Sequence, residues 1–587
     1  MGRITNKTVP AAFLMSVLVT AQGHAQVSGN TSEAGTATPI KHLVVIFGEN
    51  ESFDHYFGTY PRAANVADEP RFVPMPLTPP VNGLSYDLLF NNPNFTNKAN
   101  NNPSLDSIAA NPFRLDRTQA VTTDQNHDYM PEQQAFDDGK MDLFPLYTGS
   151  AGTGGTGAFN TTALVMGYYD GNTVTALWNY AQHFALNDNS YSSGFGPSTV
   201  GALNLVSGQT NGAIYFAGPT GSATLPADNS SVADDGHGGL TVMGDPDPYL
   251  DVCSLQQDGD AAQGNSTAEM KGRNIGDLLN AKNISWGWFQ GGFDLTLTNS
   301  GNTNYPYSPS STEGSGTGCA RASASATLLA AGVTSFPNDF VPHHASFQYY
   351  PSTRNPNHNR PASVAVIGTS ADTGTGLNQA NHQYDTHDFF DALAVGNLPS
   401  VTYLKAPAFQ NAHPGNSDPL DEQIFVVSVI NALQDSRFWE STAIVIAYDD
   451  SDGWYDHANH VVNPSFNKSI DALERTGVCE PLPGTFPAFE KPLPGLLGKP
   501  ANGRCGYGPR QPLLVISPWA KHNFVDHTVT DQSSIIRFIE DNWLDGRRIG
   551  EGSYDAFAGS LLNLFDFNQL PYTKLKLDPD TGLVTSP

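Results

Sequence analysis

The stretch KHLVVIFGENESFDHYFGTYP, residues 41–61, begins as an apolar run and ends among polar and charged side chains. The continuous, largely β-branched run at residues 43–47 is typical of a strand that is covered on both faces of a parallel sheet. In open α/β sheets, ligands bind in the crevice beyond the carboxyl ends of such strands. Glu49 and Asn50 follow the run directly, so the sequence predicts a functional site at these two residues.

Other apolar runs predict further buried strands at residues 284–290, 401–407, 442–450 and 512–518. Helical patterns lie between or after them, at residues 172–185, 419–439 and 530–544. Strands that alternate with helices predict an α/β fold with a mostly parallel central sheet.

The chain has 587 residues, of which 15% are charged and 10% aromatic. This composition predicts one large packed domain with long loop insertions.

The first residues have the features of a secretory signal peptide. Arg3 and Lys7 supply a charged start, residues 9–20 form a short apolar run, and residues 23–25 form a small-residue cleavage site. We therefore expect a signal peptide at 1–25, a flexible linker at 26–39, one domain at 40–570 and a C-terminal tail at 571–587. No segment approaches the roughly 20 apolar residues that span a bilayer. These features predict a secreted or periplasmic protein with no integral membrane segment.

The chain is strongly acidic, with a formal charge of -28. Removing residues 1–25 takes away two cations and no anions, which changes the charge from -28 to -30. Such acidity argues against nucleic acid or an anionic membrane surface as a partner.

The chain also has an even set of four cysteines, which permits three pairings in an oxidising compartment. We favour Cys253 with Cys319 and Cys479 with Cys505 over a zinc site, because no zinc-binding spacing is present.

A second strand end of interest is IVIAYDDSDGWYDH, residues 444–457, in which Asp449 and Asp450 directly follow an apolar run. Adjacent carboxylates repel each other and favour a compensating cation. Together with Glu49 and Asn50 they would offer hard oxygen ligands suited to Mg²⁺, Ca²⁺ or Mn²⁺, and Zn²⁺ or iron could bind if histidine were added. The alternative is that the two aspartates only cap a turn before Gly453.

The stretch FGPSTVGALNLVSGQ, residues 195–209, places Ser198 at the start of a predicted helix over residues 199–208. A hydroxyl at this position gains from the positive end of the helix dipole and can approach a metal, and both effects favour its alkoxide. The alternative is an ordinary serine that caps the helix. The sequence by itself leaves both possibilities open.

Histidines occur in several predicted loops. They are His127, the pair His343 and His344, the nearby His382 and His387, and His413. A single histidine is more often a surface or hydrogen-bonded residue than a ligand. Several in loops after apolar runs favour a polar site, because imidazoles donate to phosphoryl oxygens, protonate leaving groups or bind metal.

Ordered motifs from about residue 40 to 570 resemble one family. Among them are ENESFDHYFG, DQNHDYMPEQ, FGPST, NIGDLLNAKNISWGWFQGGF, HHASFQYY, NHQYDTHDFFDAL, SDPLDEQ and AYDDSDGWYDH. They resemble the bacterial phosphoesterase family that joins non-specific type C phospholipases to exported acid phosphatases. The resemblance implies a fold similar to that of alkaline phosphatase, a three-layer α/β/α sandwich with a metal at strand ends.

The resemblance also implies a role for each matching residue. Glu49, Asn50 and Asp450 match metal ligands, and Ser198 completes the set as the nucleophile that forms a phosphoserine. The divalent metal would act as a Lewis acid on the phosphoryl oxygen and keep the nucleophile ionised. The metal could be Ca, Mg, Mn, Zn or Fe.

A second implied cluster binds phosphoryl oxygens or assists proton transfer. It contains Asp449, His413 and one of His343 and His344, for which we choose His344. His127 resembles a further active-site histidine, the acid that protonates the leaving group.

The resemblance implies a small phosphate ester or a phospholipid headgroup as the substrate. The phospholipase branch carries Gly-Pro-Thr followed shortly by Asn-Arg and has extra C-terminal domains, whereas this chain reads GPSTVGALN and ends near the end of the catalytic unit. We therefore favour an acid phosphatase over a phospholipase C, although the aromatic GWF and WY sequences would suit a lipid headgroup. Glu51 replaces an arginine common in the family, which removes a cation near the site. A third possibility is an acidic extracellular binding protein that has lost activity.

Overall fold

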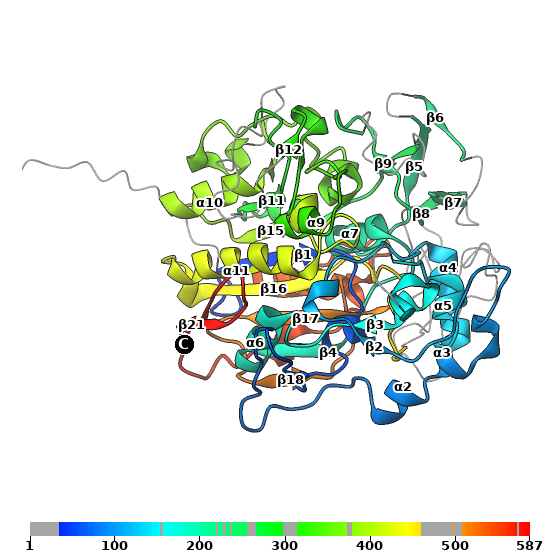
Figure 1. The fold of residues 1–587 in the computed structure, drawn as a ribbon. Coiled ribbons are helices and arrows are strands. Elements are labelled where there is room, and N and C mark those ends of the chain that lie inside the picture. Colours follow the sequence, from blue (N-terminus) through cyan, green and yellow to red (C-terminus); the bar gives the residue numbers. More distant parts are fainter. Residues whose placement is uncertain are drawn as a thin grey trace, which may run out of the picture. The chain divides into compact units, whose positions relative to one another are not determined.

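The apolar run at residues 43–47 forms strand β1 (His42–Gly48), which lies near the centre of a large, mostly parallel sheet in the computed structural model (Figure 1). Across the sheet the strands are β14 (Gln383–Tyr384), β11 (Trp286–Gln290), β15 (Val401–Lys405), β1, β16 (Thr442–Tyr448), β17 (Arg510–Ile516), β4 (Ala185–Tyr191) and β18 (Phe524–Asp526), and β19 (Thr530–Asp531) also pairs with β4. The predicted strands at β1, β11, β15, β16 and β17 are confirmed.

Only β17 runs against its neighbours in this sheet, as far as the described strands go. It pairs antiparallel with β16 and with β4, whereas the pairings of β1 with β15 and β16 are parallel. Consequently β15, β1, β16 and β4 all end at the same edge, and β17 begins there. Residues that follow β1 and β16 are therefore neighbours in space.

The structure describes residues 35–152, 157–218, 221–226, 231–234, 238–254, 266–297, 314–372, 379–459, 496, 507–571 and 574–586. From Thr36 onward the chain belongs to one compact unit, which holds all of the elements named in this section. The predicted signal peptide, Cys479 and Cys505 lie outside the described residues. Among the described helices, none has the length and apolar character needed to cross a bilayer.

The predicted helices form α6 (Thr175–His183), α11 (Pro419–Asp435) and α12 (Ser533–Trp543), and a fourth, α7 (Ser198–Ser207), begins at the predicted serine. Helix α11 starts where the Asp418 side chain accepts hydrogen bonds from the amides of Leu420 and Asp421. Helix α6 packs against α11, and α7 packs against α12. The remaining helices are α1 (Phe53–Phe57), α2 (Tyr86–Phe90), α3 (Pro93–Thr96), α4 (Tyr129–Phe136), α5 (Phe144–Tyr147), α8 (Ile275–Ala281), α9 (Ala326–Ala330) and α10 (Thr386–Val395).

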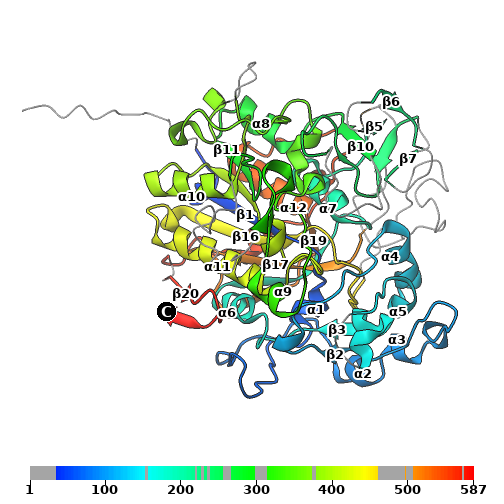
Figure 2. The same cartoon turned by 45° about the horizontal axis from the view of Figure 1, so that its top comes forward.

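Long segments outside the main sheet carry smaller elements. Between α1 and α6 the chain forms α2 to α5 and the pair β2 (Phe113–Arg114) and β3 (Gly167–Tyr168). A second sheet has the order β6 (Ala223–Thr224), β5 (Ala213–Ala217), β10 (Ser266–Met270) and β9 (Asp247–Pro248), away from the main sheet in Figure 2. The other pairs are β7 (Val232–Asp234) with β8 (Leu240–Val242), β12 (Gly314–Ser315) with β13 (Ala322–Ser323), and β20 (Lys576–Leu577) with β21 (Val584–Ser586).

The predicted disulfide between Cys253 and Cys319 is confirmed, and its Cα atoms lie 5.3 Å apart. It packs in a small apolar cluster with Phe293 and Phe340. The bond joins the segment after β9 to the connection between β12 and β13, with a sequence separation of 66 residues between its cysteines. It therefore closes a long loop that contains β10, α8 and β11.

Burial explains why the strand at residues 43–47 has no polar alternation. Leu43, Val44 and Val45 are all fully buried, which requires that both faces of β1 be covered. The strands β15, β16 and β17 contribute to the same core. The polar residues that follow β1 and β16 are therefore held by a rigid support.

Helix α7 lies unusually close to the end of β16. A Cβ atom added to Gly201 would lie only 2.0 Å from the backbone oxygen of Asp449. Glycine is the only residue that permits this approach. The contact places Ser198, one turn earlier in α7, next to the end of β16.

We predict that Gly201→Ala destabilises the protein, although alanine normally favours a helix over glycine. The added methyl group overlaps the Asp449 backbone, and overpacking of this kind costs about 1–3 kcal/mol. Chemical denaturation should show this loss of unfolding free energy. Gly35→Ala is the control, because nothing lies within 4 Å of a Cβ there, and equal stability of the two variants would contradict the close packing.

Candidate active site

The residues predicted for the site after β1 and after β16 lie together in the structure. The hydroxyl oxygen of Ser198 lies within hydrogen-bond distance of two carboxylates. It is 3.2 Å from Glu49 Oε2 and 3.1 Å from Asp450 Oδ2, and the hydroxyl donates to them. All three side chains are almost completely buried. The structure therefore places the serine oxygen between two carboxylates at the edge of the sheet.

Ser198 does not serve as a helix cap. Pro197 occupies the N-cap position of α7, no side chain caps this helix end, and Ser198 is the first helical residue. Its hydroxyl points to the carboxylates and lies at the positive end of the helix dipole. The position agrees with the predicted nucleophile, and the capping alternative is not observed.

Asn50 completes a set of converging oxygens. Its backbone has a φ of 61°, in the left-handed region that asparagine tolerates better than most residues. With the nitrogen of its amide turned inward, it donates to Glu49 Oε2 at 2.8 Å and to Asp450 Oδ2 at 3.2 Å. With the oxygen turned inward, as it stands in the structure, that oxygen faces only other acceptors. The carboxylates of Glu49 and Asp450, the Asn50 amide and the Ser198 hydroxyl are hard oxygen donors gathered at one point, so these residues fit a hard divalent metal.

Sequence reasoning missed Lys405, a fully buried lysine at the end of β15. Its ammonium pairs with Glu49 Oε1 and lies 2.8 Å from Asp449 Oδ2. The ammonium also donates to the carbonyl oxygen of Gly48 at 3.3 Å. The only sequence signal was the position of a lysine directly after an apolar run, at the edge where Glu49 and Asp449 also lie.

The carboxylates have different pKa values because their charged neighbours differ. Burial favours the neutral form of Glu49, but Lys405, Asp449 and His413 together outweigh burial and lower the pKa of this residue. Burial and the Glu49 charge raise the pKa of Asp449 to about 6, against the effect of Lys405. Burial raises the pKa of Asp450 to about 8, against the effect of His127. Asp450 therefore lacks a sufficient cationic partner within the protein and gains most from a bound metal.

A cavity of about 170 Å³ opens over Ser198. It is lined by the histidines His127, His343, His344 and His413, by the acidic residues Asp124 and Asp245, and by Pro337, Val341 and Asn416. The structure thus brings the predicted His127, His344 and His413 to one place. His382 and His387 lie elsewhere, where His382 contacts the Trp286 carbonyl and His387 contacts Asp294.

His127 faces two acidic residues across the cavity. Its Nδ1 atom lies 3.2 Å from Asp452 Oδ1 and 3.4 Å from Asp124 Oδ1. Burial lowers the pKa of His127, but Asp450, Asp124 and Asp452 outweigh this effect and raise it well above its ordinary value. The acidic neighbours therefore stabilise the protonated form of the His127 ring. Asp124, His127 and His413 also offer ligand atoms within 4.8 Å of one another.

His344 and His343 both line the cavity, but only His344 contacts the oxygen cluster. Its Nδ1 lies 2.9 Å from Glu49 Oε1, whereas His343 Nδ1 lies 3.7 Å from Asp247. Burial lowers the pKa of His344 well below its ordinary value, so the ring is neutral. Its buried Nε2 atom has no hydrogen-bond partner in the described part of the chain, and this atom is free to contact a ligand.

Glu51, which replaces a cation of the resembled family, does not line the cavity. It is buried, with its carboxylate 3.6 Å from His55. Its effect on a ligand in the cavity is therefore indirect.

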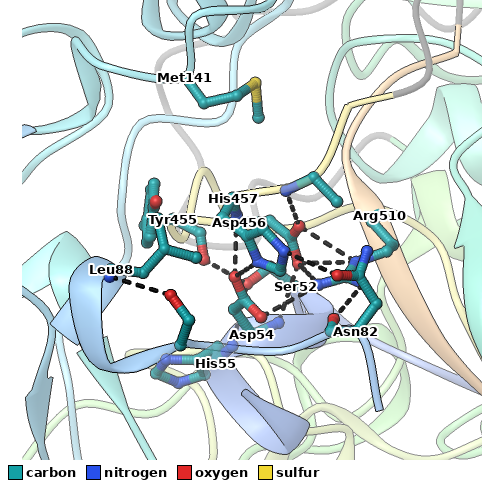
Figure 3. A network of polar contacts seen from close by, with 12 residues as sticks. Ser52, Asp54, His55, Asn82, Leu88, Met141, Tyr455, Asp456, His457 and Arg510 are labelled. Atoms are coloured by element: carbon teal, nitrogen blue, oxygen red, sulfur yellow. Dashed lines mark hydrogen bonds and ion pairs between the residues drawn. The ribbon is translucent and has the colours of Figure 1, made fainter. Parts of the chain in front are cut away.

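A buried ionic network holds the two loops that carry the site (Figure 3). Arg510, at the start of β17, donates to Asp54 at 3.0 Å and to Asp456 at 3.1 Å. His457 lies 2.6 Å from the same Asp54. Asp54 follows the Glu49 turn and Asp456 follows the Asp450 turn. The network therefore fixes both turns to the same strand, although it does not reach the cavity itself.

The fold and this site together define an α/β protein with an acidic, serine-containing centre at the ends of parallel strands. The Phosphoesterase family model matches residues 40–544. The chain belongs to this family, as its motifs predicted.

Several curated relatives are phospholipases. The chain is similar to the non-hemolytic phospholipase C of Pseudomonas aeruginosa, with 33% identity over 33% of this chain and 27% of the relative. It is also similar to the non-hemolytic phospholipase C of Burkholderia pseudomallei, with 23% identity over 93% of this chain and 63% of the relative. The similarity to phospholipase C A of Mycobacterium tuberculosis is 23% identity over 86% of this chain and 73% of that protein. The chain spans less than two thirds of the length of the first two relatives.

Arg510→Met should destabilise the protein strongly. The change leaves Asp456 buried without its cation and Asp54 with only His457, and breaking a buried ion pair costs about 3–5 kcal/mol. Denaturant unfolding measures the effect. Lys282→Met is the matched control, because Lys282 forms an exposed pair with Asp545 that contributes at most about 1 kcal/mol. Similar losses in both variants would show that the buried network does not anchor the loops.

Proposed function

We propose that this protein is an exported, metal-dependent phosphoric ester hydrolase that acts through a phosphoserine at Ser198. The observation that carries the proposal is the place of Ser198, which begins a helix and contacts Glu49 and Asp450 on the floor of a histidine-lined cavity. Membership of the Phosphoesterase family supports the same chemistry. The inactive binding protein is less well supported, because the whole set of predicted site residues is present and lies together.

The reaction would proceed in two displacements. In the first, the Ser198 oxygen, whose proton has passed to solvent, attacks phosphorus, and the bond from phosphorus to the leaving oxygen breaks. His127 gives its proton to that leaving oxygen. In the second, water attacks the phosphoserine, the neutral His127 ring takes a proton from this water, and the bond from phosphorus to the Ser198 oxygen breaks. His344 and His413 would bind phosphoryl oxygens from the cavity wall.

A divalent metal fits the oxygens of Glu49, Asn50, Asp450 and Ser198. When bound, it would supply Lewis-acid stabilisation of negative charge on the reacting oxygens. The convergence of Glu49 and Asp450 on the Ser198 hydroxyl supports this assignment. The metal can be Ca, Mg, Mn, Zn or Fe, because the oxygen set lies beside histidines that softer ions also accept.

We favour a phosphomonoesterase of the acid phosphatase type. The cavity of about 170 Å³ is smaller than the roughly 300–1,000 Å³ of sites for drug-sized ligands, which suits a small phosphate ester. The second candidate is a phospholipase C that cleaves phosphatidylcholine-type diesters. The names of the curated relatives favour it, and the exposed Asp124 at the cavity would suit a cationic headgroup.

The proposal includes the finer features that the sequence predicted. The helix pairs α6 with α11 and α7 with α12 support a three-layer α/β/α sandwich of the alkaline phosphatase type. The predicted signal peptide and the disulfide between Cys253 and Cys319 support a secreted or periplasmic location.

Loss of the nucleophile and loss of a metal ligand should differ in their effects. Ser198→Ala should keep most bound metal while activity falls by about two orders of magnitude or more, because the covalent route is lost. Asp450→Ala should lose both metal and activity. Metal analysis is combined with release of p-nitrophenol from its phosphate monoester and from its phosphorylcholine ester. Faster monoester turnover supports the acid phosphatase, and faster turnover of the phosphorylcholine ester supports the phospholipase C. Full metal and full activity in Asp450→Ala would contradict the ligand assignment.

The stereochemical course tests the covalent intermediate. Each in-line displacement inverts phosphorus, so two displacements should retain its configuration. The measurement uses a chiral phosphate ester, together with acid quenching and mass spectrometry of the peptide that contains Ser198. Net inversion without a trapped phosphopeptide would make water the direct nucleophile.

A further inference from the structure

Lys405 forms a second cationic position beside the proposed metal site. Its side chain is fully buried, and its ammonium contacts Glu49 Oε1, Asp449 Oδ2 and the Gly48 carbonyl. The ring of Phe47 lies under the ammonium, with its centre 4.8 Å away. Three oxygens and an aromatic face therefore surround the ammonium.

Glu49 bridges this position and the proposed metal site. Its Oε2 atom faces Ser198 Oγ at 3.2 Å, whereas its Oε1 atom faces Lys405. His344 Nδ1 lies 2.9 Å from the same Oε1 atom. One carboxylate thus holds the ammonium on one oxygen and would hold the proposed metal on the other.

Without the ammonium, the groups around it would suit a divalent metal. They comprise oxygens of Glu49 and Asp449, the Gly48 carbonyl and the nearby His344 imidazole, which are ligands that Mn²⁺ or Zn²⁺ accepts. Enzymes with two metals commonly hold them about 3.5–4 Å apart at shared ligands. The arrangement around Glu49 has this form, but a lysine occupies one of the two positions.

We infer that the Lys405 ammonium permanently occupies the position of a second metal, so that the centre binds one divalent ion at Glu49, Asn50, Asp450 and Ser198. The inference rests on the metal site of the proposed function. Asp449 then acts through Lys405 as a positioning residue. Its Oδ2 atom holds the ammonium, and its Oδ1 atom accepts hydrogen bonds from the backbone amides of Asn50 and Asp450.

The charge balance of the centre agrees with one metal. Glu49, Asp449 and Asp450 contribute three negative charges, and Lys405 with one divalent ion contributes three positive charges. The lysine therefore neutralises the buried carboxylates without dependence on metal supply.

The test compares Mn²⁺ binding in the full chain and in Lys405→Met. Both proteins also carry Asp124→Asn, which removes the separate group formed with His127 and His413. The parent, which is the Asp124→Asn chain with Lys405 intact, should bind about one Mn²⁺ per chain and give an uncoupled electron paramagnetic resonance spectrum. The Lys405→Met variant should bind about two Mn²⁺ ions and give an exchange-coupled spectrum. Without metal, the variant should melt several degrees below the parent, because two buried carboxylates lose their cation.

The double variant Lys405→Met with Asp449→Asn is the matched control. It removes one positive and one negative charge together, so it should again bind about one Mn²⁺ and melt near the parent. If Lys405→Met fails to fold, a folded double variant with one Mn²⁺ still supports the inference, and failure of both variants overturns it.

Two further results would overturn the inference. One is a coupled pair of Mn²⁺ ions in the parent. The other is Lys405→Met that melts like the parent and binds a single ion. A parent that binds no Mn²⁺ and no other divalent ion would instead contradict the metal site of the proposed function, and the inference with it.

Discussion

Mutual repulsion between buried carboxylates is the constraint on which this site depends. Glu49, Asp449 and Asp450 lie together without contact with bulk water, where charges interact far more strongly than in water. Positive groups from other elements of the fold offset this repulsion. Lys405 comes from β15, and the positive end of α7 carries Ser198 to the same point. The side chains at the ends of these strands are therefore held by opposite charges as well as by packing.

Packing around this centre allows little movement. Helix α7 approaches the end of β16 so closely that Gly201 has no room for a side chain, and Arg510 ties Asp54 to Asp456 below the two turns. A preformed arrangement of this kind lets charged groups act without reorganising during a reaction. The strong apolar core around β1 and β16 offsets the cost of holding so many buried polar groups in place.

Sequence patterns predicted the features that depend on local order. The strand at residues 43–47 was evident because both of its faces are buried, and residues directly after two such strands formed the predicted cluster. Strand β4 was missed because its sequence, ALNDNSY, has no apolar run, and its polar residues are satisfied only by distant partners, such as Asn187 with Asp526. Lys405 was missed because its partners are also distant in the sequence. A lysine after a strand is usually exposed, and only the parallel pairing of β15 with β1 brings it to Glu49.

The location of His127 has an evolutionary consequence. Glu49, Asn50 and Asp450 follow core strands and Ser198 begins α7, whereas His127 belongs to the long segment between α1 and α6, outside the main sheet. Substitutions, insertions and deletions accumulate more readily in such segments than in a packed sheet. Descendants of this scaffold can therefore acquire new leaving-group preferences by remodelling one insertion, while the inherited centre at the strand ends stays intact.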